Sequence, residues 1–166
     1  MVKNVQASGS VHIKKALRLA REEKTDAARQ LLSTVSLEEL TADDVRSVAL
    51  AHSYCNDIDA SERAWRRVVA IGDELAGDRF MLASAQVDLG RPDEALGNLR
   101  LEIELGKKSG DACYLVSAVI TAASILFNRR EDAVAQDLLA LIADEDGYYI
   151  RGVGFRTKRQ LLNGRD

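Results

Sequence analysis

Hydrophobic residues recur along the chain with a period near 3.6 residues, and short polar turns separate one such stretch from the next. This spacing is typical of amphipathic helices, whereas the alternation of apolar and polar residues that marks strands is not sustained. The helices expected from it cover residues 11–23, 26–35, 42–55, 60–75, 78–90, 92–110, 112–127 and 133–143. The predicted fold class is therefore all-α.

Boundary residues support these assignments at several places. Thr41 precedes one apolar stretch and Asp78 opens another, and both residue types accept hydrogen bonds from the first turn of a helix. Pro92 falls at the start of its helix, where a missing N–H does no harm, and Gly90 and Gly110 stand where the flanking helices should end. The turns between helices should therefore be short.

Four alanines recur near the starts of alternate helices. Ala28, Ala64, Ala95 and Ala133 are 36, 31 and 38 residues apart, close to the period of helix-pair repeats. A small side chain at this place lets two helix backbones approach closely. The spacing favours an α-solenoid of about four helix pairs, and a non-repetitive helical bundle is the alternative.

Composition bears on which disulfides, metal sites and catalytic groups the chain could form. The chain has 166 residues and a net charge of −3, with two cysteines and two histidines. Cys55 and Cys113 fall inside expected helices, so we expect free buried thiols in a reducing compartment. His12 and His52 are 40 positions apart and lack further ligands nearby, so neither a metal site nor a cofactor is expected. The polar face Ser117, Thr121 and Ser124 is interpreted as helix packing because no base is placed to activate it.

The ends of the chain and its longest apolar run bear on localisation. Residues 1–10 lack the apolar core of a secretion signal and are expected to be flexible. The most apolar stretch, residues 112–127, has 16 residues, fewer than a bilayer requires. These features predict a cytoplasmic protein that contacts no membrane.

The segment FMLASAQVDLGRPDEALGNLRLEIEL, residues 80–105, resembles the tetratricopeptide repeat. Leu82 and Ala83 match the leucine and the small residue of its first helix, Gly90 matches its turn, and Ala95 matches the small residue of its second helix. The resemblance implies a repeat domain over residues 11–147 and a groove lined by the first helix of each pair. It also implies that the protein binds other proteins.

The C-terminal segment 148–166 is expected to form a basic capping helix and tail. Ile150, Val153 and Leu161 would share one apolar face. This segment has a net charge of +4, which leaves −7 on the rest of the chain. An acidic body with a basic end favours electrostatic steering of a protein partner or a head-to-tail homodimer, and not nucleic-acid binding.

The resemblance places one set of candidate partner-binding residues on the first helix of each pair. If Phe80 is exposed, it would be the aromatic anchor for the partner; if it is buried, it belongs to the core. Because apolar residues at 118, 122 and 125 would leave an unusual exposed strip, we expect the chain's own C-terminal segment to cover them. A second candidate is the acidic edge at Asp57 and Asp59. The first-helix set comprises Ser53, Phe80, Ser84, Val87 and Asp88, and the apolar strip comprises Ala118, Ala122 and Ile125.

The resulting hypothesis is a non-catalytic protein-binding scaffold that acts as an adaptor or a secretion chaperone. The alternative within binding is an immunity protein that covers a cationic nuclease toxin with its carboxylates. A helical enzyme and a DNA-binding protein are further alternatives that the motifs do not favour.

Overall fold

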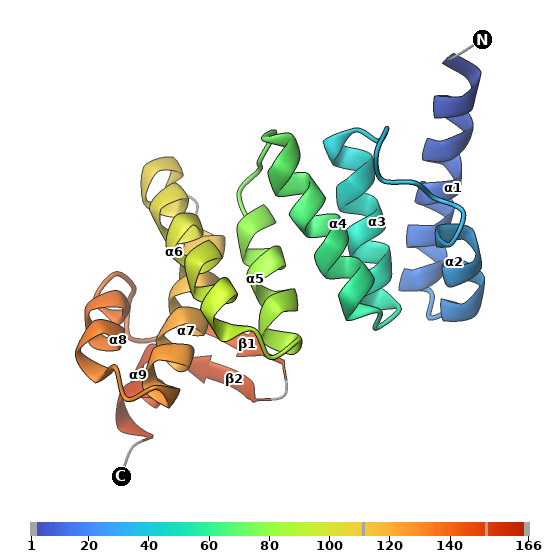
Figure 1. Ribbon diagram of the computed structural model, residues 1–166. Coiled ribbons are helices and arrows are strands. Elements are labelled where there is room, and N and C mark those ends of the chain that lie inside the picture. Colours follow the sequence, from blue (N-terminus) through green and yellow to red (C-terminus); the bar gives the residue numbers. More distant parts are fainter. Residues whose placement is uncertain (1–2, 111, 152, 165–166) are drawn as a thin grey trace. The chain divides into compact units, whose positions relative to one another are not determined.

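A computed structural model describes residues 3–110, 112–151 and 153–164 of the chain (Figure 1). These residues form nine helices and two short strands, so the expectation of a mainly helical protein is confirmed. The chain divides into two compact units, residues 1–78 and 79–166. Each unit is built from two helical hairpins.

The first unit contains α1 (Lys3–Arg21), α2 (Thr25–Leu32), α3 (Ala42–Tyr54) and α4 (Ile58–Ile71), and α3 packs against both α1 and α4. Thr41 caps α3 as predicted, because its side chain accepts a hydrogen bond from the Asp44 N–H. The prediction that the first helix begins near Val11 is wrong, since α1 already begins at Lys3. Ser10 lies inside α1, where its hydroxyl donates to Asp44 Oδ1 at 3.1 Å instead of capping the helix. Residues 1–2 lie outside the described residues.

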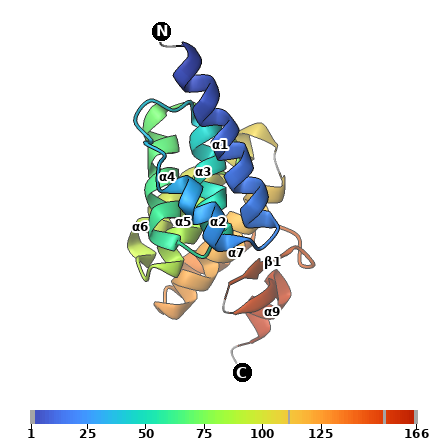
Figure 2. The ribbon, with the colours of Figure 1, turned by 90° about the vertical axis from the view of Figure 1, so that its right-hand side faces the viewer.

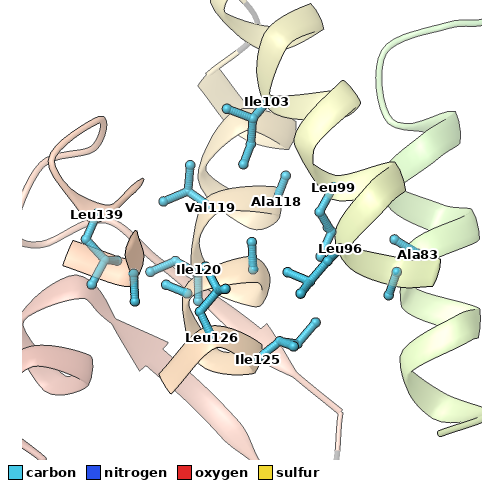
Figure 3. Close-up of a cluster of buried hydrophobic side chains, with 14 of the residues drawn as sticks. Ala83, Leu96, Leu99, Ile103, Ala118, Val119, Ile120, Ile125, Leu126 and Leu139 are labelled. Atoms are coloured by element: carbon cyan, nitrogen blue, oxygen red, sulfur yellow. The ribbon is translucent and has the colours of Figure 1, made fainter. Parts of the chain in front are cut away.

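The second unit contains α5 (Asp78–Asp88), α6 (Pro92–Ser109), α7 (Ala112–Asn128) and α8 (Asp132–Leu139). Asp78, the first residue of α5, is still the last residue of the first unit. Pro92 stands in the first turn of α6, and Gly110 ends that helix with a left-handed φ of 73°. Both boundaries were predicted. The core of this unit lies between α6 and α7, where the side chains point toward one another (Figure 3), and it includes Leu96, Leu99, Ile103, Val119, Ile120, Leu126 and Leu139.

The C-terminal segment is not the predicted capping helix. It forms two antiparallel strands, β1 (Gly147–Ile150) and β2 (Gly154–Thr157), and then the short helix α9 (Lys158–Asn163). Tyr148, Tyr149 and Ile150 are residue types that favour strands, and Gly154 adopts a φ of 95° that suits the turn between the strands. Thr157 and Gln160 then start α9 with a capping box.

All four helical hairpins close with the same turn. The turn contains one residue with left-handed φ: Glu23 at 60°, Asn56 at 57°, Gly90 at 70° and Arg130 at 64°. In each case the N–H of the next residue donates to the carbonyl five positions earlier, over 2.8–3.0 Å. The left-handed residues are 33, 34 and 40 positions apart. The repeat is therefore present in the backbone as well as in the sequence pattern.

Small buried residues keep a fixed distance from this turn. Seven positions before the left-handed residue, each first helix carries an alanine that is 0% exposed. Five positions after it, each second helix carries another small buried residue. These two sets are Ala16, Ala49, Ala83 and Ala123 on the first helices, and Ala28, Ser61, Ala95 and Ala135 on the second.

The predicted alignment of the four alanines is therefore half wrong. Ala28 and Ala95 occupy the repeating position, but Ala64 lies three residues beyond it, where Ser61 stands. The Ser61 hydroxyl donates to the Ala49 carbonyl at 3.0 Å, which satisfies a polar group at the close approach. Ala133 is exposed, and Ala135, two positions further, is the buried alanine of α8.

Candidate binding surfaces

The face formed by α5 and α7 in the second unit is the place where the sequence predicted a partner groove. Phe80 is only 3% exposed there, with its ring centroid 5.2 Å from that of Tyr148 and 6.2 Å from that of Tyr114. Phe80 is therefore buried instead of exposed, and the condition on which it would anchor a partner is not met, because the chain's own tyrosines cover it. The contact with Tyr148 is edge-to-face, a favoured geometry for aromatic pairs.

The C-terminal hairpin provides this cover. Figure 2 shows β1 beside α7, and Ile150 is buried in the same cluster as the predicted apolar strip, Ala118, Ala122 and Ile125. Arg151 Nη1 lies 2.8 Å from Asp88 Oδ2, so Asp88 is held by an ion pair within the unit. The expectation that the C-terminal segment packs on this face is confirmed, with a β-hairpin in place of a helix.

The other first-helix candidates are only partly accessible. Ser84 and Val87 on α5 are half-buried, and Val87 packs against the core of the second unit. Ser53 on α3 of the first unit is also half-buried. A partner contact at these three residues stays a prediction.

The acidic edge of the first unit has a structural role at one of its two residues. Asp57 is the N-cap of α4 and accepts from the Ala60 N–H at 3.3 Å. Its Oδ2 also lies 3.3 Å from His52 Nδ1. Burial nevertheless lowers the pKa of His52, because the loss of water outweighs the attraction to Asp57. Asp59 is exposed and is free to meet a partner's charge, so that half of the acidic-edge hypothesis stays a prediction.

A buried ion pair in the first unit was not expected from the sequence. Arg46 of α3 is buried, with 9% of the residue exposed, and its Nη2 is 2.8 Å from Asp78 Oδ2. Asp78 also accepts from the Leu75 N–H at 2.8 Å, and Arg46 contacts Asp43 Oδ1 at 2.7 Å. The hydrogen bond to Asp78 raises the pKa of Arg46, so the guanidinium stays charged. This pair fixes the segment that connects α4 to α5.

A groove of about 1000 Å³ lies in the second unit, between the α7–α8 turn and the C-terminal segment. We call it the basic groove. Three arginines line it, and Asp132 is the one carboxylate among its described lining residues. Its lining consists of Ser124, Phe127, Asn128, Arg130, Asp132, Val153, Arg156, Arg159, Gln160, Leu161, Asn163 and Gly164.

Two of these arginines have no carboxylate partner. The Arg130 side chain makes no hydrogen bond or ion pair with the residues that the structure describes, and Arg156 donates only to the Phe155 carbonyl at 3.0 Å. Arg159 is held by Glu145 in an exposed ion pair. Phe127 and Leu161 supply half-buried apolar surface in the same groove. The groove can therefore bind anionic groups next to apolar ones.

The hydroxyl groups of α7 are engaged in the helix itself. Ser117, Thr121 and Ser124 each donate to the carbonyl four residues earlier, over 2.8–2.9 Å. Such bonds are common for hydroxyl side chains inside helices, and they confirm the packing interpretation of this stripe. Ser124, whose hydroxyl lies in the lining of the basic groove, belongs to this set.

Cys55 is buried as expected, but the expectation that Cys113 is buried is wrong, because it is exposed. Neither cysteine forms a disulfide with a described residue. Among the described residues no group of three or more His, Cys, Asp or Glu side chains could hold a metal ion. None of the helices in the described ranges combines the length and the apolar character needed to cross a bilayer.

The chain was compared with protein-family models, curated proteins and solved structures, and it matches none of them.

Proposed function

We propose that this protein is a non-catalytic binding scaffold of the tetratricopeptide type and that its basic groove holds an acidic, partly apolar segment of a partner protein. The observation that supports the proposal most directly is the pair of guanidiniums at Arg130 and Arg156, which line the groove and have no carboxylate partner among the residues that the structure describes. The repeated turn and the alanine pairs supply the rigid frame that such scaffolds use.

The chemistry of the groove selects the ligand. A guanidinium binds a carboxylate through two parallel hydrogen bonds, so Arg130 and Arg156 favour glutamate or aspartate side chains. Phe127 and Leu161 line the same groove and favour an apolar residue in the same segment. A polyanion without apolar groups would use only the charges. The proposed ligand therefore mixes acidic and apolar residues.

The face of α5 and α7 is not the proposed peptide site, because Tyr148 and Ile150 already cover it. An adaptor and a secretion chaperone would both use the basic groove, so the proposal is made at the level of peptide binding. The immunity alternative depends on the acidic edge and gains no support, since Asp57 is occupied as a helix cap.

The experiment measures binding of a labelled peptide of alternating glutamate and leucine by fluorescence anisotropy. We expect each of Arg130→Gln and Arg156→Gln to weaken binding about tenfold, because a hydrogen bond between charged groups contributes about 1.5 kcal/mol. Arg100→Gln is the matched control: Arg100 is an exposed arginine of α6 outside the groove, and binding should not change.

Equal affinity of the double variant and the unchanged protein would overturn the proposal. A polyuridylate competitor separates protein from nucleic-acid ligands. We expect it to displace the peptide poorly, and displacement by polyuridylate as efficient as by the unlabelled peptide would also count against a peptide site.

A further inference from the structure

The first unit contains a separate, partly open cavity of about 430 Å³, lined by residues of α2, the connector 33–41, α3 and α4. Its volume falls within the range of small-molecule sites in proteins. It is lined by Arg29, Leu32, Ser33, Val35, Leu37, Val48, His52, Asp57, Ala60 and Arg63. The basic groove and this cavity have no lining residue in common.

One side of the cavity is apolar. Leu32, Val48 and Ala60 are buried at 4%, 2% and 8% exposure, and each comes from a different helix. Val35 and Leu37 of the connector are half-buried and close the same side. A chain of a few methylene groups would find a dry wall here, and burying it would be favourable by the hydrophobic effect.

The polar part of the lining has an excess of positive charge. The exposed Arg63 makes no hydrogen bond or ion pair with the described residues. Arg29 donates to the Cys55 carbonyl at 2.6 Å, and its nearest carboxylate, Asp26, is 3.8 Å away and fully exposed. Arg63 thus presents a guanidinium with no partner among the described residues, and Arg29 adds a second positive charge that is already hydrogen-bonded to a carbonyl.

The acidic group in the lining is already engaged. Asp57 accepts from the Ala60 N–H and lies 3.3 Å from His52 Nδ1. The His52 ring is largely buried, with 16% of its side chain exposed, and it carries no charge near neutral pH because burial lowers its pKa. A cationic ligand would therefore meet two arginines and a carboxylate that is already hydrogen-bonded. An anionic ligand would instead be attracted by the two arginines.

We infer that this cavity is a binding site for a small organic monocarboxylate with a short aliphatic chain. The carboxylate binds Arg63, with Arg29 adding positive charge to the site, and the aliphatic chain lies against Leu32, Val35, Leu37 and Val48. The excess of positive charge in the lining favours an anion over a cation. This site is independent of the proposed peptide binding, so either one can fail without the other.

The test is a titration of the ¹⁵N-labelled full chain with octanoate, followed by amide chemical shifts. We expect saturable shifts in the segment 29–63, about tenfold weaker binding in Arg63→Gln, and unchanged binding in the Arg100→Gln control. Octanol has the same chain length without the charge and should bind at least about tenfold more weakly.

Three results would overturn the inference: no saturable shifts, shifts centred in the second unit, or equal binding of octanoate and octanol. Arg63 is exposed, so Arg63→Gln is expected to fold, and its amide spectrum verifies this. A second variant, Val35→Asp, places a negative charge in the apolar wall and should abolish octanoate binding. Retained binding in Val35→Asp would also contradict the site.

Discussion

The two units close their hairpins with the same turn but fill one equivalent position with opposite chemistry. Ten positions before the left-handed residue, the second hairpin of the first unit carries Arg46, whereas the first hairpin of the second unit carries Phe80. Arg46 is buried against Asp78, and Phe80 is buried beneath Tyr148. The repeated backbone therefore determines which position is buried, but a charged or an aromatic side chain can occupy that position.

This difference has an energetic consequence. A buried ion pair is close to neutral for stability when compared with apolar residues of similar volume, because desolvation offsets the attraction of the charges. Burying an aromatic side chain is favourable by itself. We therefore expect the aromatic contact to stabilise its unit, and the ion pair mainly to fix the geometry of the segment before α5.

The largest effect is expected from breaking the ion pair on one side. Arg46→Ala should lower the free energy of unfolding by about 4 kcal/mol, because it leaves the Asp78 carboxylate buried without its counter-charge. The measurement is urea unfolding followed by circular dichroism. The double variant Arg46→Met with Asp78→Leu should recover most of the loss. A double variant as unstable as Arg46→Ala would show that the pair stabilises the unit in its own right.

Phe80→Ala should lower the free energy of unfolding by about 3 kcal/mol, the range for removing a buried aromatic ring. It should also loosen the C-terminal hairpin, because the Tyr148 ring loses its edge-to-face partner. Phe155→Ala is the control: this residue is 55% exposed, and we expect a loss below about 1 kcal/mol. Equal losses at both positions, measured by urea unfolding, would contradict the assignment of Phe80 to the core.

The repeating small positions give a narrower comparison within one helix. Ala135→Leu should lower the free energy of unfolding by about 2 kcal/mol, because a larger side chain cannot fit where two backbones approach. Ala133→Leu, two residues away on the exposed side of α8, should change it by less than about 0.5 kcal/mol. Thermal unfolding of the two variants measures both losses of stability. If Ala133→Leu is the more destabilising variant, the alignment predicted from the sequence is correct.

The smallest effect concerns pH and the first unit. The pKa of His52 is lower in the folded chain than its ordinary value of about 6.5, so the unfolded chain binds the proton more readily. Stability is therefore full above pH 6.5 and decreases as the pH falls below that value. His52→Gln should flatten this part of the stability profile, and the control His12→Gln should leave it unchanged. If the free energy of unfolding of His52→Gln still falls steeply below pH 6.5, the pH dependence comes from other titratable groups.

Local signals made much of the helical fold predictable. Thr41, Pro92 and Gly110 fix helix ends through hydrogen bonds and φ preferences that depend only on adjacent residues. The alanine register was harder to predict because Ser61 replaces alanine at one repeat, and because Ala133 and Ala135 are equally small. Which of two nearby alanines is buried depends on the face that α8 turns toward its neighbours.

The candidate sites depend on contacts between distant segments. Arg46 and Asp78 are 32 positions apart, and the free arginines of the basic groove come from a helix turn and a strand. The residues Tyr148–Ile150 were assigned to a helix because apolar residues three and four apart fit a helical face as well as a bent hairpin. The sequence therefore predicts that the C-terminal segment covers the α5–α7 face, but not that it does so as a β-hairpin.

The most direct test of this account is a nuclear Overhauser measurement between the aromatic rings of Phe80 and Tyr148. The account holds that the C-terminal hairpin covers the face of α5 and α7, with the two ring centroids 5.2 Å apart. It predicts strong cross-peaks between the ring protons of these two residues in the full chain. Their absence, together with a solvent-exposed Phe80 ring, would contradict it and return that face to the partner groove predicted from the sequence.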